Sequence, residues 1–543
     1  MIYGEESIPI PVGRGIDSYN HTANLEDGYC PIVSNFIAKG DRLVTRKGFI
    51  PPLNIDTRST YPTNGHDVWY TRLPDVAQET WPVAIWGVGV DTWMIRQFDR
   101  DTPGATSGDT AIVKFAAIQH FRGAVAYLDK IYILDDSGLN SDTGWNWAAG
   151  TVTEASIETD LAGKRGLFVF KDRMWCWDDN KIYYTDAPAS PGAYPETWDV
   201  NGKFIHIGAG TGLGKIHAII PIGTKLFIFT NTGFYNVSVL GSPVNWVVRL
   251  VDATVAVNHQ NCAYENKGII YFVDTRGVWV TNQDEVKLIS EPIQNEFDTG
   301  ILEEIYYEWK LVPFDDGIIV CKTDTRLDGA FPAGTQKTVS SAKLFYSKLD
   351  NIFWTEFTFI QSGTQPADII AGFSNMEMAH IWGKANYIVL VHGQVVDPTF
   401  GALTAECLVY SGYQDTLTKL ATAAETDPVN CYYLSKTIRG KMLDEKRSLL
   451  GYINFSAPSN ANGQAVNIYY NWLTEADPTR GEATITPLVA DWHEGIIRIN
   501  GPEFFRHVRF ELELILSNNI QEYTILGSAI DVQSHRKTGR EIS

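Results

Sequence analysis

A hairpin-like phrase, two apolar strands joined by a polar turn, recurs along most of this chain. Its turn centres fall near Asp91, Asp129, Asp172, Gly223, Asn266, Asp316 and Lys384, at steps of 38, 43, 51, 43, 50 and 68 residues. Apolar strands flanking Gly, Asn or Asp turns are typical of β-hairpins. Repetition at this period predicts a β-propeller, in which each blade is one four-stranded sheet. We therefore expect an all-β fold with a β-propeller-like body of six to eight blades over residues 61–430, with seven favoured.

The two ends of the chain depart from this rhythm. Residues 1–60 are predicted to form an N-terminal segment that leads into the propeller, with short strands at 31–38 and 41–44. Residues 431–535 have strand patterns with fewer tight turns and are predicted to form a C-terminal β-sandwich platform, followed by a basic tail at 536–543. One helix is expected at Ser290–Phe297, where Ser290 can cap it and Pro292 lies in its first turn, and the apolar spacing up to Tyr306 extends the helical pattern.

The charge of the chain limits its partners. It contains 64 acidic and 44 basic residues, for a formal net charge of −20. An acidic surface repels phosphates, which argues against sequence-specific binding of nucleic acid but suits a wall that nucleic acid slides past. No apolar run reaches the roughly 18 residues of a membrane-spanning helix, and no secretory signal opens the chain, so we expect neither.

The cysteines indicate the compartment in which the protein folds. The six are Cys30, Cys176, Cys262, Cys321, Cys407 and Cys431. They are scattered and form no C-x-x-C pair, so we predict buried free thiols in a protein that folds in a reducing cytoplasm.

Motifs that could carry chemistry are incomplete. Asn140–Trp147 resembles the Asp-box of sialidase-like propellers, which is a structural turn, and the acidic cluster around Asp135 lacks the spacing of a calcium loop. The glycine-rich run Gly208–Gly214 is followed by neither GK[ST] nor a helix, and His493 lacks the second histidine of a zincin motif. We therefore predict a protein that is not an enzyme, with no catalytic, cofactor-binding or metal-binding residue. A β-propeller glycan hydrolase or lectin is the alternative, because the carboxylate pair of a hydrolase is defined by distance in space.

Three stretches of the chain resemble sequences of one protein family. They are Gly13-Arg-Gly-Ile-Asp-Ser18 with Ser34-Asn-Phe36 and Arg46-Lys-Gly-Phe49; Pro188–Thr230, which contains Pro195-Glu-Thr-Trp198; and Phe505–Leu514 with Thr524–Gly527 and Ile530–Val532. In these stretches the chain resembles the tail nozzle proteins of short-tailed bacteriophages, the tail tubular protein B-like and related tail stabilisation proteins.

The resemblance implies a structural virion protein that forms the distal nozzle ring of the tail and retains, then conducts, DNA during ejection. It implies several partners: further copies of this chain, commonly in a hexamer, the head-to-tail adaptor and portal ring, tail fibres or tailspikes, and duplex DNA passing through the lumen without sequence recognition. It also implies a location in the virion tail after assembly in the host cytoplasm. Another tail tube or hub component is the alternative within this class, and the family carries no catalytic residue over to this chain.

Overall fold

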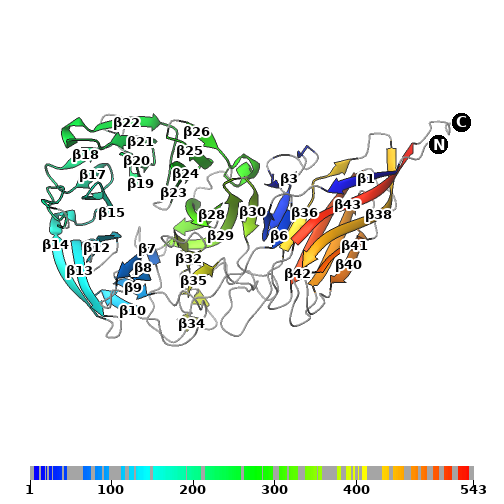
Figure 1. Cartoon of the computed structure of the whole chain (residues 1–543), viewed down its shortest axis with the longest axis horizontal. Coiled ribbons are helices and arrows are strands. Elements are labelled where there is room, and N and C mark those ends of the chain that lie inside the picture. Colours follow the sequence, from blue (N-terminus) through cyan, green and yellow to red (C-terminus); the bar gives the residue numbers. More distant parts are fainter. Residues whose placement is uncertain are drawn as a thin grey trace.

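The computed structural model describes most of residues 122–297 and parts of 5–45, 65–115, 305–357, 376–411 and 431–536. Side chains are described mainly in 14–45, 122–141, 155–297, 309–357, 431–437 and 509–514. Within this part of the chain, strands dominate and the helices are short 3-10 turns. The strands form two units, a ring of blades and a pair of sheets beside it (Figure 1). The prediction of an all-β propeller with a C-terminal sandwich is confirmed.

Seven blades form the propeller in the described part of the chain: five are separate four-stranded antiparallel sheets, the sixth is four antiparallel strands of a larger sheet, and the seventh is a three-stranded sheet. Blade 1 contains β7 (Gly65–Pro74), β8 (Thr80–Val88), β9 (Asp91–Arg96) and β10 (Ile112–Phe115), and blade 2 contains β11 (Gly123–Tyr127), β12 (Lys130–Asp135), β13 (Gly138–Asn146) and β14 (Thr151–Glu158). Blade 3 contains β15 (Arg165–Phe170), β16 (Arg173–Trp177), β17 (Lys181–Tyr184) and β18 (Phe204–His206), and blade 4 contains β19 (Ile216–Ile222), β20 (Lys225–Thr230), β21 (Gly233–Ser238) and β22 (Val247–Asp252). Blade 5 contains β23 (Ala263–Asn266), β24 (Ile269–Asp274), β25 (Gly277–Thr281) and β26 (Val286–Leu288), and blade 6 contains β27 (Ile305–Phe314), β28 (Gly317–Leu327), β29 (Lys337–Lys348) and β30 (Trp354–Phe357). Blade 7 contains β31 (Met376–His380), β32 (Tyr387–His392) and β35 (Glu406–Ser411). A separate hairpin is formed by β33 (Val396–Asp397) and β34 (Gly401–Ala402).

The first strands of the blades form the inner wall of the ring. β7 contacts β11, β11 contacts β15, and β19, β23, β27 and β31 follow one another in the same way. β31 of blade 7 also contacts β7 of blade 1, so the ring closes with seven blades (Figure 1).

The second unit, the platform, is built from both ends of the chain. Its strands are β1 (Glu5–Ile10), β2 (Gly15–Ile16), β3 (Tyr29–Cys30), β4 (Ile32–Ser34), β5 (Phe36–Lys39), β6 (Arg42–Thr45), β36 (Cys431–Leu434), β37 (Ile438–Arg439), β38 (Asp444–Ala457), β39 (Val466–Thr474), β40 (Thr479–Ile485), β41 (His493–Ile499), β42 (His507–Leu516) and β43 (Thr524–Arg536). One sheet has the order β41-β38-β43-β6-β5, with β1 also paired to β43; the other contains β4-β36-β42-β39-β40. The first 45 residues, expected as a separate segment, therefore supply strands to both sheets of the C-terminal unit.

Aromatic rows between the blades form much of the core. The central strands β12, β20 and β24 are buried along nearly their whole length, because each blade packs between two others. Between blades 4 and 5, the ring centroid of Phe229 lies 4.6 Å from that of Phe234 and 5.1 Å from that of Phe272. Burial of one such side chain contributes about 1.5–3 kcal/mol.

The expected helix is shorter than predicted. A 3-10 helix, η3, spans Glu291–Glu296 with Pro292 in its first turn, but Ser290 does not cap it. The Ser290 hydroxyl oxygen instead accepts a hydrogen bond from the Val278 N–H at 2.9 Å. The extension to Tyr306 was wrong, because β27 begins at Ile305 and pairs with β28 along its whole length. Long-range strand pairing overrides the local helical spacing here.

Several predicted turn centres lie where expected. Asp172 and Gly223, both with positive φ, and Asn266 lie at the turns between the first and second strands of blades 3, 4 and 5. The centre near Asp91 also lies where expected, because Asp91 begins β9 and pairs with Val88, the last residue of β8. The centres at Asp129, Asp316 and Lys384 lie outside the described residues.

The cysteines with described side chains agree with the prediction of buried free thiols. Cys30, Cys176, Cys262, Cys321 and Cys431 are buried free thiols, while the side chain of Cys407 lies outside the described part. Burial raises the pKa of the thiols of Cys30, Cys176 and Cys262 well above its ordinary value, so they are poor nucleophiles.

Candidate functional site at the propeller–platform junction

The acidic cluster around Asp135 is a hydrogen-bonded turn between β12 and β13. The buried Asp135 carboxylate accepts hydrogen bonds from the Ser137 N–H at 2.8 Å, the Ser137 hydroxyl at 2.7 Å and the Gly138 N–H at 2.9 Å. Asp136 pairs with Arg122 at 2.9 Å. The donors of the protein itself therefore occupy these carboxylates, and their role is structural.

The other candidate motifs also lack a metal or substrate site. Asn140 and Asp142 lie within β13, which continues to Asn146, so the Asp-box resemblance falls on a strand and not on a turn. His493 begins β41 and pairs with Ala457. Residues 209–213 of the glycine-rich run lie outside the described residues. Among the described residues, no three His, Cys, Asp or Glu side chains are grouped to hold a metal ion.

The turn at Asp135 recurs at the same place in neighbouring blades. Between the second and third strands of blade 3, the Asp178 carboxylate accepts from the N–H groups of Asn180 and Lys181 at 3.2 and 3.0 Å. In blade 4 the Thr230 hydroxyl oxygen accepts from the Thr232 N–H at 3.1 Å. A short polar side chain thus supplies the acceptor that these tight turns lack.

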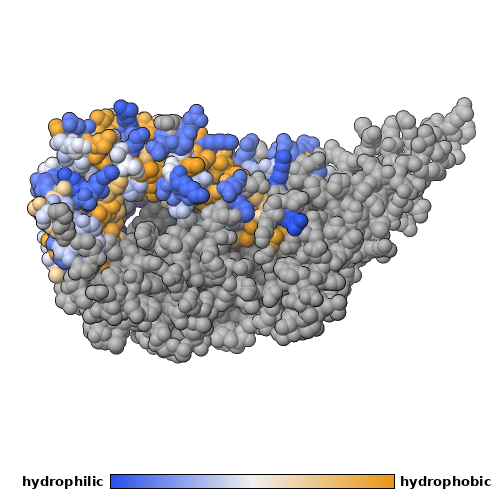
Figure 2. All heavy atoms as spheres, in the orientation of Figure 1, coloured by the Kyte–Doolittle hydropathy of each residue, from blue (hydrophilic) through white to orange (hydrophobic). Residues whose placement is uncertain are grey.

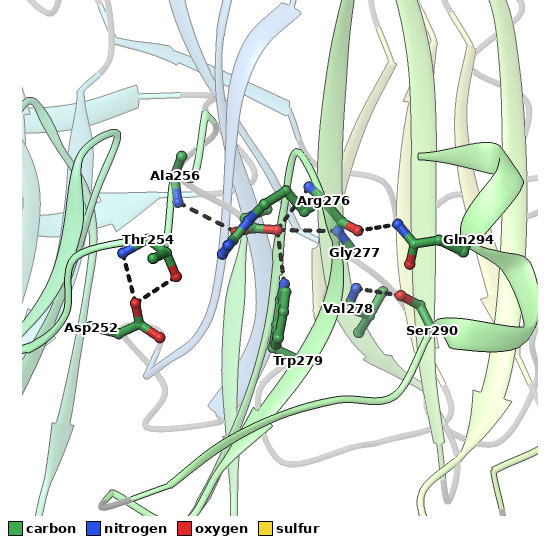
Figure 3. A network of polar contacts seen from close by, with 10 residues as sticks. Asp252, Thr254, Ala256, Arg276, Gly277, Val278, Trp279, Ser290 and Gln294 are labelled. Atoms are coloured by element: carbon green, nitrogen blue, oxygen red, sulfur yellow. Dashed lines mark hydrogen bonds and ion pairs between the residues drawn. The ribbon is translucent and has the colours of Figure 1, made fainter. Parts of the chain in front are cut away.

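Blade 5 has the most connected of these turns (Figure 3). The buried Asp274 carboxylate accepts from the N–H groups of Arg276 and Gly277 at 2.9 and 3.1 Å, and from the Trp279 indole N–H at 2.8 Å. The Arg276 guanidinium donates to the same carboxylate at 2.7 Å and lies over the Trp279 ring, 4.9 Å from its centroid. A fully satisfied carboxylate of this kind fixes the turn and leaves little capacity for a ligand.

The network continues from this turn to η3. The Gln294 side-chain amide donates to the Arg276 carbonyl at 2.7 Å, and Ser290 binds Val278 as described above (Figure 3). On the other side of η3, the Ser18 N–H donates to the Pro292 carbonyl at 2.8 Å, and the Ser18 hydroxyl donates to the Asn295 side-chain oxygen at 2.6 Å. The N-terminal segment is therefore bound to the connection between blades 5 and 6.

Gly15 and Asn35, from the first of the three stretches that carry the family resemblance, permit the close approach of the platform to blade 6. Gly15 has φ +84°, and a Cβ built on it would lie 2.6 Å from both the backbone N and O of Trp354. Asn35 has φ +59° and donates its backbone N–H to the Glu356 carbonyl at 2.9 Å. Glycine and asparagine are the residues that adopt this left-handed conformation most readily.

These contacts join blade 6 and the platform into one continuous sheet. β30 pairs in parallel with β4 at Glu356 and Ser34, and β2 pairs with β30 at Gly15 and Trp354. The resulting sheet has twelve strands and runs from β27 in the propeller to β40 in the platform. Its core continues across the join, since Trp354 and Phe353 belong to the same buried cluster as Phe36 and Tyr433.

A partly buried ion cluster lies beside this join. The Lys322 ammonium donates to the Glu296 carbonyl at 2.7 Å and lies 5.5 Å from the Trp309 ring centroid. Lys343 pairs with the Glu296 carboxylate at 3.0 Å. Burial raises the pKa of the nearby Glu356 carboxyl; the Lys343 charge opposes this shift and the Glu296 charge adds to it. The cluster ties η3 to β28 and β29.

The residues behind the family resemblance are thus structural. Gly15, Ser18 and Asn35 lie at the junction, and Glu196, from the Pro195–Trp198 phrase, accepts from Lys130 at 2.8 Å and from the Tyr132 hydroxyl at 2.5 Å in blade 2. Arg46–Phe49 lies outside the described residues. Sequence reasoning identified these motifs but not the junction that they form, although Gly15 and Asn35 are the residue types that signal unusual backbone geometry.

Comparisons with known proteins add little to this picture. No protein-family model and no curated protein matches the chain. Among solved structures it is similar to the AfRom2 CNH domain (10% identity, covering 65% of this chain and 97% of that one, TM-score 0.35) and to the Myceliophteria thermophila Cps50 (Swd1) β-propeller domain (9%, 65% and 98%, TM-score 0.34). It is also similar to an exo-β-1,3-galactanase from Phanerochaete chrysosporium (8%, 86% and 100%, TM-score 0.23). These identities and TM-scores are too low to indicate a substrate or a partner. Within the described residues, no helix is both long enough and apolar enough to span a membrane.

Proposed function

We propose that this protein is a structural component of the tail of a short-tailed bacteriophage. Copies of it form the distal nozzle ring, which retains DNA and conducts it during ejection. The ring assembles in the host cytoplasm below the head-to-tail adaptor and portal ring, as a hexamer, and carries tail fibres or tailspikes. The protein works without catalysis, and its partners are other virion proteins and duplex DNA that passes without sequence recognition.

The observation that carries the proposal is the junction of the propeller with the platform. Two units of one chain move relative to each other by default unless their interface is large and apolar. Here the twelve-stranded sheet, the shared core and the contacts of Ser18 with η3 hold the two units together. A subunit of this kind suits a ring that bears the force of packaged DNA, and its junction contains Gly15, Ser18 and Asn35 from the first of the stretches through which the chain resembles nozzle proteins.

The charge of the chain is consistent with the same role. With a formal net charge of −20, a lumen formed from its acidic surfaces releases few counterions from passing DNA, so the duplex slides with little adhesion. A lumen lined with lysine and arginine would contradict this part of the proposal.

Electron microscopy of the purified particle, reconstructed without imposed symmetry, tests the proposal. We expect a ring of copies at the end of a short tail, with an axial channel wide enough for duplex DNA. Absence of the chain from the particle, together with a free monomer that has a carboxylate-lined central pocket, would overturn the proposal in favour of a glycan-processing propeller.

A further inference from the structure

Blade 4 differs from the rest of the chain in its charge. Residues 200–251 contain no Asp and no Glu, although 64 of the 543 residues of the chain are acidic. This run includes all of blade 4 except Asp252, the last residue of β22. Its charged side chains are Lys203, Lys215, Lys225 and Arg249. Because these four cations contribute +4 to a total of −20, the rest of the chain carries −24.

The outer edge of the same blade exposes apolar side chains. Five large hydrophobic side chains are exposed in the described part of the chain, and four of them lie here: Leu240 (59%), Val244 (86%), Val247 (54%) and Leu250 (51%). β22 is the outermost strand of blade 4 and pairs with β21 on its inner side. Figure 2 shows hydrophobic surface along the rim where Figure 1 places β22. An apolar strip on an unprotected edge strand favours association with another chain.

Arg249 places one available cation within this strip. Lys203 and Lys215 lie near carboxylates of blade 3, Asp186 and Asp179. Arg249 is exposed on β22, and within the described residues it has no ion-pair partner. The edge therefore combines apolar contact area with a single unpaired arginine, the composition that is typical of protein–protein contact sites.

We propose that the outer edge of blade 4, residues 240–251, is the surface on which a second copy of this chain docks through an acidic face. Arg249 is the only charged side chain in residues 240–251, so contact between two such edges would bring two cations together, whereas contact with an acidic face brings the cation against charge of opposite sign. The contact is therefore head-to-tail, and repetition of a head-to-tail contact closes into a ring when the rotation permits it. The inference rests on the proposed function, for which it supplies the subunit contact.

Duplex DNA fits this edge less well than a protein does. Phosphates are bound by lysine, arginine and other donors, and they make no use of exposed aliphatic side chains. The four apolar residues would stay exposed to water in a DNA complex but become buried against a second subunit.

Sedimentation velocity of the full chain over a range of concentrations and salt tests the proposal. We expect concentration-dependent association that weakens at high salt. Arg249→Glu should weaken it by at least about tenfold, since it places a carboxylate against an acidic partner. Val247→Ser combined with Leu250→Ser should weaken it with little change in the salt dependence. The matched control is Lys287→Glu, the same reversal at an exposed residue on β26, the outermost strand of blade 5, and it should have no effect.

The outcomes separate this inference from the nozzle function. A wild-type chain that stays monomeric at every concentration, or an equal loss from Arg249→Glu and Lys287→Glu, would overturn the inference. DNA binding that Arg249→Glu abolishes, without self-association, would assign the edge to nucleic acid and also overturn it. A tail ring in which the edge of blade 4 faces solvent would refute the contact but keep the nozzle. Self-association through blade 4 by a chain absent from the particle would keep the contact and remove the nozzle.

Discussion

Replacement of Gly15 by alanine is expected to loosen the join between the platform and the propeller. The new Cβ would lie 2.6 Å from the backbone N and O of Trp354 and 3.1 Å from the carbonyl carbon of Phe353. These are backbone atoms of buried residues, so the clash cannot be relieved by rotation of a side chain. Alanine at φ +84° adds a backbone cost of about 1–2 kcal/mol. Displacement of β2 from β30 would weaken pairing and packing by about 1–2 kcal/mol more, which gives a total loss of about 2–4 kcal/mol.

The measurement is urea unfolding followed by tryptophan fluorescence and far-UV circular dichroism, with midpoints compared between variants. Gly241→Ala is the matched control, because Gly241 has φ +71° but a Cβ there would meet no atom within 4 Å. It carries the backbone cost without the clash, so we expect a loss of about 1–2 kcal/mol. The difference between the two variants isolates the close approach of Gly15 to Trp354.

An equal loss in the two variants would refute the reasoning, since the clash would then contribute nothing. A separate early transition in the Gly15→Ala variant would instead agree with it, because it would show one unit unfolding before the other once the join is weakened.

Three further predictions concern buried and half-buried carboxylates. Asp274→Ala should lower the midpoint of urea unfolding, by about 2–4 kcal/mol in free energy, because the N–H groups of Arg276, Gly277 and Trp279 lose their acceptor; an unchanged midpoint would contradict this role. Burial would raise the pKa of Asp178, but hydrogen bonds from the Tyr183 hydroxyl, two backbone N–H groups and Lys164 outweigh it and hold the pKa below its ordinary value. The Asp178 carboxylate therefore stabilises the fold fully above the pKa that this group has in the unfolded chain, and the stabilisation is lost as the pH falls below about 4. Asp178→Asn should flatten the acid limb of a stability–pH curve. Glu356 has the opposite sign: its raised pKa favours the protonated form in the folded state, so its contribution is lost as the pH rises. Glu356→Gln should stabilise the protein at neutral pH but not at acid pH in the same assay, and a variant that destabilises at neutral pH would contradict the assignment.

The propeller could be predicted from the sequence because its blades are local structures. Blades 1 to 6 each use four consecutive strands, so the alternation of apolar residues and turns within about 40–50 residues contains the information that the fold needs. The turns at Asp135 and Asp274 show why one copy of a turn motif is ambiguous in the sequence. Asp135-x-x-Gly138 and Asp274-x-x-Gly277 have the same spacing at the same position in two blades, which identifies a structural turn. Considered alone, the first of them resembles a fragment of a calcium loop.

The platform could not be predicted in the same way. Glu5 pairs with Gln533, and Ser34 pairs with both Glu356 and Tyr432. No periodicity specifies which of two distant strands are partners, because the pattern of a strand fixes its buried face and not its neighbour. The sequence does not predict the junction for this reason, even though it shows the motif residues that form it.

The pairing of the two chain ends also explains how the propeller stays closed. Blades 1 and 7 are each built from one contiguous segment, and the described strands of the two contact each other through β7 and β31 without sharing a sheet. The chain leads into the ring after β6 and leaves it after β35, and the flanking strands pair in the platform, β4 with β36 and β1 with β43. The platform therefore holds the two ends of the ring together. A sheet shared by the first and last blades could do the same, but here those blades have separate sheets. Ring closure and platform stability are coupled for this reason, and a perturbation of the platform core should be felt first at the seam between blades 1 and 7.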